Sequence, residues 1–228
     1  SPMSIQENLF RLRAAIPAGV TLVAVSKTWP AEAVLQAYDA GQRVFGENRV
    51  QELVPKAADL PGDIQWHLIG HLQRNKVRQV LPHVALIHSI DSTELLERVD
   101  REAGQLGRRV DVLLQVHIAQ EEAKTGFSYP EAEALLQGGQ LAGYRNVTVR
   151  GLMGVATFTD NMAQVKAEFE GLHALYAKVR EAGWLNPSEF NVLSMGMSGD
   201  YQLAIACGAT MVRVGSLIFG HRDYGAGA

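Results

Sequence analysis

The sequence predicts an α/β fold in which eight parallel strands close into a (β/α)8 TIM barrel. Eight short apolar runs alternate with helical patterns, and the loops between them are short. The length of 228 residues is that of one such barrel. We therefore expect a single domain over residues 1–228. Periodicity does not report closure, so an open, doubly wound sheet is the alternative fold.

An additional helix is expected before the first strand. Ile5, Leu9, Leu12 and Ile16 recur at spacings of 4, 3 and 4, which predicts a helix over residues 4–16 with one buried face. The eight expected strands cover residues 22–28, 43–46, 66–70, 85–90, 110–116, 147–153, 189–193 and 210–214. The expected helices between them cover residues 31–40, 48–58, 75–80, 91–104, 130–137, 162–181 and 199–207.

Composition excludes several classes of protein. The formal net charge is -3, so the chain lacks the basic surface that binding to a nucleic acid backbone requires. No apolar run reaches 18 residues, so we expect no membrane partner, and the N-terminus has no signal-peptide pattern. Cys207 is the single cysteine, which fits a reducing compartment. We expect a cytoplasmic protein.

Lys27 ends the first apolar run, where a buried strand opens into a loop. Burial disfavours the ammonium and lowers the pKa of a lysine toward the neutral, nucleophilic amine. This is the environment of a lysine that forms a Schiff base. The alternative is a lysine whose alkyl chain covers the barrel rim while its ammonium stays in water.

Two loops are candidates for a phosphate site. Phosphate is usually held after strands seven and eight of such a barrel. Residues 194–199 combine two hydroxyls with glycines ahead of a helix, and Gly215 and Ser216 follow the eighth strand. Each loop alone would be an ordinary Gly/Ser turn, but the two together predict a phosphate site.

Arg213 is expected to point into the barrel. Alternation along the eighth strand places Met211 and Arg213 on one face and Val212 and Val214 on the other. A buried arginine requires an acceptor. Lysine, phosphate site and inward arginine together describe a site for pyridoxal 5'-phosphate, whose ring nitrogen takes an Asp or Arg partner. An arginine would keep that nitrogen unprotonated, because it does not release its proton, and the electron sink would be weak.

Six segments, in order along nearly the whole chain, closely resemble the pyridoxal phosphate homeostasis protein family. They are VAVSK at 23–27, FGEN with QE at 45–52, WHLIGHLQRNK at 66–76, RGLM at 150–153, LSMGMS at 193–198 and MVRVG at 211–215. The chain departs from the family at three positions. His117 stands where asparagine is common, His71 where proline is frequent, and Ser216 where threonine is common.

The resemblance implies a barrel of the alanine racemase N-terminal type with Lys27 as the internal aldimine lysine. It also implies that Ser194, Gly215 and Ser216 lie near the phosphate, that Arg213 faces the ring nitrogen, and that Asn48 and Met195 line the pocket. The function implied is binding of pyridoxal 5'-phosphate and its buffering or delivery, in vitamin B6 homeostasis, without established catalytic turnover, and we assign no catalytic residues. Apo forms of enzymes that use this cofactor would be the protein partners.

Related racemases add a β-rich domain that supplies a catalytic tyrosine. The present sequence ends soon after the eighth strand, so we expect a cofactor that keeps one face open. No apolar surface stripe stands out beyond the barrel helices, so we expect a monomer. One alternative is a small amino acid racemase or lyase that uses Lys27 as its base, with Tyr201 or Tyr224 opposite. Another is a barrel that binds other phosphorylated metabolites without using Lys27.

The remaining polar candidates have structural interpretations. His67 and His71 are four residues apart, but they straddle the end of an expected strand and not a helix, and no glutamate general base accompanies them. We therefore expect isolated, hydrogen-bonded histidines and no metal site. The four considered are His67, His71, His88 and His117. Glu47 is a candidate acid/base, and an ion pair with Arg49 or Arg74 explains it equally well.

Overall fold

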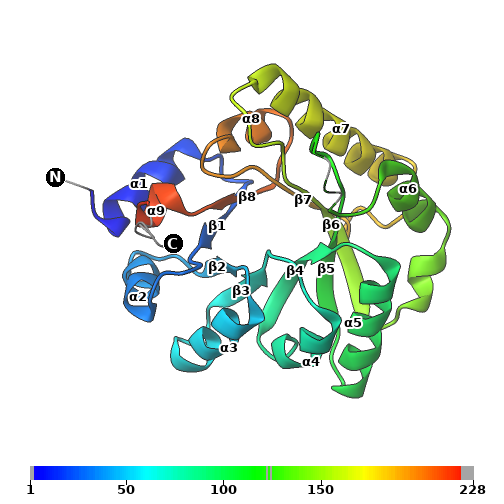
Figure 1. The fold of residues 1–228 in the computed structure, drawn as a ribbon, viewed down its shortest axis with the longest axis horizontal. Helices are drawn as coiled ribbons and strands as arrows, with labels where there is room; N and C mark the ends of the chain where they lie inside the picture. The colour runs from blue at the N-terminus through cyan, green and yellow to red at the C-terminus, as the bar shows by residue number, and fades with distance from the viewer. Residues whose placement is uncertain (1–2, 122, 124, 222–228) are drawn as a thin grey trace.

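The eight strands form one closed parallel barrel in chain order, as Figure 1 shows for this computed structural model, which describes residues 3–121, 123 and 125–221. Closure is made by β1 and β8, which pair from Thr21↔Met211 to Ala24↔Val214. The predicted barrel is therefore confirmed and the open sheet is excluded. The strands are β1 Thr21–Val25, β2 Val44–Glu47, β3 Gln65–Leu68, β4 Val84–Ile90, β5 Val110–Gln115, β6 Val147–Gly154, β7 Val192–Met195 and β8 Met211–Val214.

Helices surround the barrel (Figure 1). They are α1 Ile5–Ala15, α2 Ala31–Asp39, α3 Val50–Asp59, α4 Val77–Val80, α5 Thr93–Gln105, α6 Tyr129–Gln137, α7 Met162–Glu181, α8 Tyr201–Ala206 and α9 Ser216–Phe219, with 3-10 turns η1 Arg74–Lys76 and η2 Gln140–Gly143. The expected N-terminal helix, α1, lies beside α9, where Asn8 Nδ2 donates to the carbonyl of Ile218 at 2.9 Å. The sequence did not predict α9, because four residues are too few for a helical period.

Serine caps fix where several helices begin. The Ser4 hydroxyl accepts from the amide of Glu7 at the start of α1. Ser92 caps α5 in the same way. Ser128 and Glu131 form a reciprocal capping box at α6. These side chains satisfy amides that lack partners in the first helical turn, which explains why the predicted starts fall close to the observed ones.

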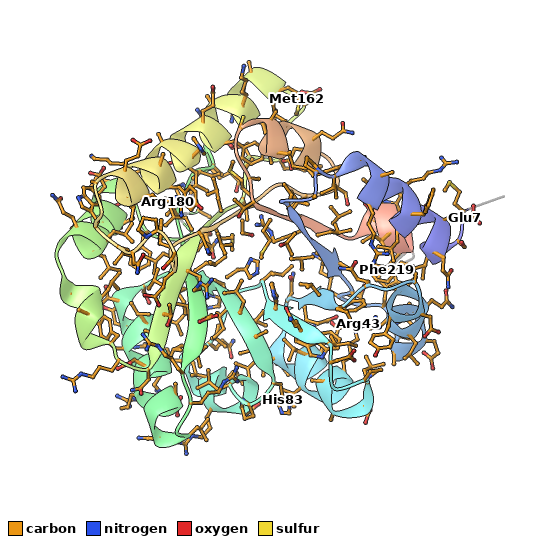
Figure 2. The ribbon with its side chains drawn as sticks, turned by 180° about the vertical axis from the view of Figure 1, so that it is seen from behind. Glu7, Arg43, His83, Met162, Arg180 and Phe219 are labelled. Atoms are coloured by element: carbon orange, nitrogen blue, oxygen red, sulfur yellow. The ribbon has the colours of Figure 1, made fainter. Side chains whose placement is uncertain are left out.

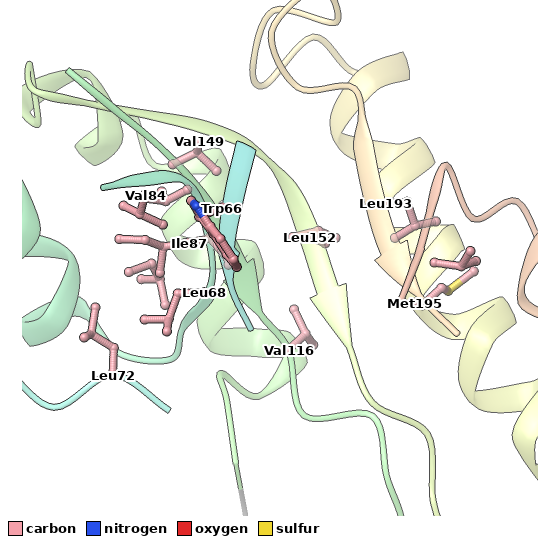
Figure 3. Close-up of a cluster of buried hydrophobic side chains, with 14 of the residues drawn as sticks. Trp66, Leu68, Leu72, Val84, Ile87, Val116, Val149, Leu152, Leu193 and Met195 are labelled. Carbon is pink, nitrogen blue, oxygen red and sulfur yellow. The ribbon is translucent and has the colours of Figure 1, made fainter. Parts of the chain in front are cut away.

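Two apolar clusters stabilise the barrel. A small cluster inside it contains Val23, Leu86, Leu113, Met153 and Met211. The larger one lies between the strands and the helices, and Figure 3 shows part of it around Trp66, Ile87 and Leu152. Figure 2 shows side chains filling the space between the strands and the outer helices. Alternation puts Met211 in the inner cluster and Val212 and Val214 in the outer one, as predicted for β8.

The seventh strand differs from its prediction. A strand was expected over residues 189–193, but β7 covers Val192–Met195. A turn occupies the expected start, because the amides of Glu189 and Phe190 both donate to the carbonyl of Asn186. The strand is therefore displaced toward the C-terminus, and Ser194 and Met195 belong to it and not to the loop that follows.

Within the part of the chain that the structure describes, we find no helix with the length and apolar character needed to span a membrane.

Candidate functional site

A pocket of about 600 Å³ opens at the C-terminal ends of the strands. Such barrels carry their chemistry at this end. The loops after β1, β2, β3, β6, β7 and β8 all contribute to it. Its lining comprises Val25, Lys27, Asn48, Ile69, residues 155–159, Met162, residues 197–200, Arg213, Gly215 and Ser216.

Five of the seven predicted site residues meet in this pocket: Lys27, Asn48, Arg213, Gly215 and Ser216. Lys27 lies two residues beyond the end of β1 and is partly buried. Asn48 directly follows β2. Arg213 is 3% exposed and comes from the inner face of β8. Residues from three strand ends thus converge, as expected for a parallel barrel.

Ser194 and Met195 do not line the pocket, which corrects their predicted places. Both are fully buried in β7 and alternate across the sheet. Ser194 points into the barrel, where its hydroxyl contacts Arg213 and His88. Met195 points outward into the larger apolar cluster, as Figure 3 shows together with Leu193. The cause is the displacement of β7.

Ser198, the second hydroxyl of the predicted loop, lines the pocket. Its hydroxyl accepts from the amide of Gly215 at 3.3 Å, so the loops after β7 and β8 meet there. A Cβ on Gly215 would lie 3.1 Å from the carbonyl oxygen of Val25, so this backbone packs closely on the end of β1. Amides and hydroxyls of these loops can hold a phosphate. The helices that follow have six and four residues, so their dipoles contribute little.

Asp200 is a pocket residue that the sequence did not single out. Its carboxylate accepts from the amide of Met197 at 2.7 Å and so closes the turn after β7. Burial raises the pKa of this carboxyl, while the Arg213 guanidinium opposes the shift. The only signal in the sequence is an Asp placed just before a helix, a common capping pattern with no functional content.

Arg213 is held by the barrel wall. One guanidinium nitrogen donates to Ser194 Oγ at 2.5 Å and another to the carbonyl of Gly154 at 3.0 Å. Burial lowers the pKa of this guanidinium to about 10 and nearby Asp200 raises it, so the arginine stays charged at neutral pH. The charge therefore has fixed partners and still borders the pocket.

A chain of hydrogen bonds continues from Arg213 across the barrel interior. His88 Nδ1 lies 3.0 Å from Ser194 Oγ, and His88 Nε2 lies 2.9 Å from His67 Nδ1. Arginine only donates, so each of these contacts has one donor and one acceptor when Ser194 donates to His88 and His88 donates to His67. Burial lowers the pKa of His67 to about 4 and that of His88 well below its ordinary value, so both are neutral at pH 7. We expected isolated histidines, and these two are instead bonded to each other.

Glu168 holds the pocket wall after β6. This buried residue of α7 accepts from both the amide and the hydroxyl of Thr157, each at 2.7 Å. The same hydroxyl accepts from the amide of Gln120 at 2.7 Å, which ties the loops after β5 and β6 together. Figure 2 shows Met162, another wall residue, at the start of α7. No local pattern in the sequence predicts the contact between Glu168 and Thr157.

The other histidine candidates lie outside the pocket. His117 borders a separate cavity of about 230 Å³ and its Nδ1 accepts from the amide of Thr125 at 3.3 Å. His71 is exposed and lies 3.2 Å from a carboxylate oxygen of Asp91.

Glu47 pairs with Lys56 at 2.9 Å, which corrects the expected arginine partners. Of the two tyrosines considered as a racemase base, Tyr201 packs in the apolar core. Tyr224 lies outside the described residues.

Comparison with known proteins agrees with this geometry. The family model for the alanine racemase N-terminal domain matches residues 1–223. The pyridoxal phosphate homeostasis protein of Vibrio alginolyticus is 40% identical over 97% of this chain and 99% of its own length. That of Pasteurella multocida is 36% identical, also over 97% of this chain and 99% of its own length.

Solved structures show the same barrel. PipY of Synechococcus elongatus, solved without PLP, is 45% identical and superposes with a TM-score of 0.88 over 95% of this chain and 100% of its own. The same protein with PLP bound gives 44% identity and a TM-score of 0.85. Alanine racemase of Clostridium difficile, 13% identical with a TM-score of 0.75 over 96% of this chain and 56% of its own, shares the fold. The present chain belongs to the pyridoxal phosphate homeostasis protein family, within the alanine racemase N-terminal domain fold.

Proposed function

We propose that this protein binds pyridoxal 5'-phosphate in the pocket at the strand ends, attaches it through Lys27, and buffers or delivers it in vitamin B6 homeostasis. The observation that carries the proposal is one pocket lined by the amine of Lys27, the guanidinium of Arg213 and the loops of Ser198 and Gly215. The PLP-bound structure of PipY and the names of the homologues support it.

The pocket fits the three functional groups of this cofactor. Lys27 supplies an amine for the aldehyde. Gly215 and Ser216 offer amides and a hydroxyl for the phosphate, and Ser198 adds a second hydroxyl at hydrogen-bond distance from Gly215. Arg213 is fixed by Ser194 and Gly154, so it can present a remaining N–H to the ring nitrogen.

When bound, the cofactor supplies an electron sink that stabilises negative charge on an attached amino acid. Arg213 donates and does not release its proton, so it holds the ring nitrogen in its unprotonated form and weakens that sink. The hydrogen-bond chain through Ser194 and His88 keeps the guanidinium in place. These residues therefore favour holding the cofactor over promoting carbanion chemistry.

The Lys27→Ala variant tests the binding site through its absorbance with pyridoxal phosphate and its affinity for the cofactor. We expect pyridoxal phosphate to give wild-type protein a visible absorbance band that borohydride reduction fixes covalently, and the variant to show neither. Lys166→Ala, at an exposed position of α7, is the matched control and should behave as wild type. Unchanged cofactor affinity and absorbance in Lys27→Ala would contradict the proposal and would favour a site for other phosphorylated metabolites.

A transfer assay tests delivery. We propose that the holo-protein acts as a cytoplasmic monomer and passes its cofactor to apo forms of enzymes that use it. Holo-protein mixed with such an apoenzyme, while a phosphatase destroys free cofactor, should restore activity faster than the same amount of free pyridoxal phosphate. Racemisation or transamination of an amino acid by the holo-protein itself at about 1 per second or more would instead establish an enzyme.

A further inference from the structure

The two peptide groups that flank Lys27 are both bonded to side chains of α3. The carbonyl of Ser26 accepts from Lys56 Nζ at 3.0 Å. The amide of Thr28 donates to Glu52 Oε2 at 2.6 Å. Lys56 and Glu52 are one helical turn apart and pair with each other at 2.7 Å. One turn of a helix therefore fixes the main chain on either side of the pocket lysine.

The turn that follows Lys27 is strained. Thr28 has a φ of 69°, and among the described residues it is the one non-glycine with positive φ. This conformation is unfavourable for a β-branched residue, so it persists only where neighbours impose it. The bond from its amide to Glu52 is such a constraint.

A second carboxyl group lies behind this helical turn. Glu47, at the end of β2, is fully buried, and its Oε2 accepts from Ser26 Oγ at 2.5 Å and from Lys56 Nζ at 2.9 Å. Its Oε1 has no hydrogen-bond partner within the described chain. Burial raises the pKa of Glu47 to about 7, opposed by Ser26 and Lys56 and reinforced by Glu52.

Lys56 is thereby excluded as the reactive amine. Its three N–H groups have three acceptors: the carbonyl of Ser26, Glu47 Oε2 and Glu52 Oε2. An ammonium held in this way has no lone pair to offer. Lys27 borders the pocket, and Lys56 lies behind its wall.

We propose that Glu52 and Lys56, with Glu47 behind them, are positioning residues that hold the backbone of Lys27 so that its amine points into the pocket. The inference rests on the proposed attachment of the cofactor to Lys27. In that step the neutral amine attacks the aldehyde carbon, a C=N bond replaces the C=O bond, and the oxygen leaves as water with the two amine protons. The three residues contact neither partner and affect the step through geometry.

The experiment separates attachment from binding. Covalent attachment is followed by absorbance after mixing with pyridoxal phosphate, and non-covalent binding by titration with pyridoxine 5'-phosphate, which has no aldehyde. Removing the acceptor for Thr28 in Glu52→Ala should slow attachment about 10-fold or more. The affinity for pyridoxine phosphate should stay within about 2-fold, because the pocket wall is unchanged.

Matched variants make the result specific. Glu52→Gln keeps an acceptor oxygen and should recover most of the attachment rate. Glu32→Ala removes an exposed acid from the first turn of the neighbouring helix α2 and should leave both measurements unchanged. Attachment at the wild-type rate in Glu52→Ala, or an equal loss of both measurements, would overturn the inference. Failure of wild-type protein to attach the cofactor would instead overturn the proposed function.

Discussion

Ser194 and Ser198 show how two serines in one short segment have different roles. Ser194 lies in β7 and links the Arg213 guanidinium to His88 inside the barrel. Ser198 lies in the loop that follows and contacts the amide of Gly215 beside the pocket. The first serine keeps a buried charge satisfied, and the second is available to a ligand.

Alanine substitution should separate these roles. Ser198→Ala should lower the affinity for pyridoxal phosphate about 10-fold through the loss of one charge-assisted hydrogen bond, with urea unfolding unchanged. Ser194→Ala leaves Arg213 and His88 without their shared partner and should lower the free energy of unfolding by about 1–3 kcal/mol. Cofactor titration and urea unfolding of both variants measure the two effects. A loss of stability in Ser198→Ala and not in Ser194→Ala would contradict these roles of the two serines.

The buried histidine pair predicts a loss of stability on acidification. The pKa of His67 is lowered to about 4 in the folded protein from an ordinary value of 6.5, so the unfolded chain takes up the proton first as pH falls. His88 shifts in the same direction. The stabilisation that depends on these neutral histidines should therefore be fully present above pH 6.5. As pH falls from 6.5 toward 4, the free energy of unfolding should decrease by up to ~1.4 kcal/mol per pH unit for each histidine.

Glu47 changes the free energy of unfolding in the opposite direction over this pH range, so the experiment needs a variant without its carboxylate. Its pKa is raised from 4.5 to about 7, so its contribution is present below pH 4.5 and is lost as pH rises through about 7. Urea unfolding of Glu47→Gln across this pH range should remove this opposing contribution, while that of Asp200, whose pKa is also raised, stays the same in every variant. Adding His67→Gln should reduce the slope. A slope that does not change with His67→Gln would show that these histidines are not the cause.

At the scale of elements, periodicity and capping located most strands and helices, because both are local. The start of β7 was missed because the turn at Asn186 interrupts an otherwise strand-like run. The pocket residues Lys27 and Arg213 could be predicted because parallel strands bring their C-terminal ends together, whereas Asn48 was expected only from the family resemblance. The bond from His88 to Ser194 joins residues 106 positions apart, and only the closed barrel makes it.

Substitution of Gly151 tests how β6 and β7 pack against each other. It lies in β6 with a φ of 156°, and a Cβ there would lie 1.6 Å from the carbonyl oxygen of Val192 in β7. The backbones would have to separate, so Gly151→Ala should destabilise the protein by about 3 kcal/mol or more or prevent its folding. Gly143→Ala, where nothing lies within 4 Å, is the control and should stay within about 0.5 kcal/mol of wild type. Urea unfolding measures the stability of both variants. Equal stability of the two would contradict the register of β6 and β7.

At the scale of the whole molecule, one barrel supports two kinds of protein. The alanine racemase of Clostridium difficile matches this chain with a TM-score of 0.75, but the match covers only 56% of the racemase. Fold alone therefore does not assign an activity. The proposed function rests instead on the pocket, in which Lys27, Arg213 and the loops after β7 and β8 meet.

The most direct test of this account is to identify the residue that carries the cofactor. Protein incubated with pyridoxal phosphate and reduced with borohydride is digested, and the modified peptide is sequenced by mass spectrometry. We predict one cofactor per chain, attached to Lys27. Attachment at Lys56, labelling spread over surface lysines, or no attachment at all would contradict the assignment of this pocket as the cofactor site.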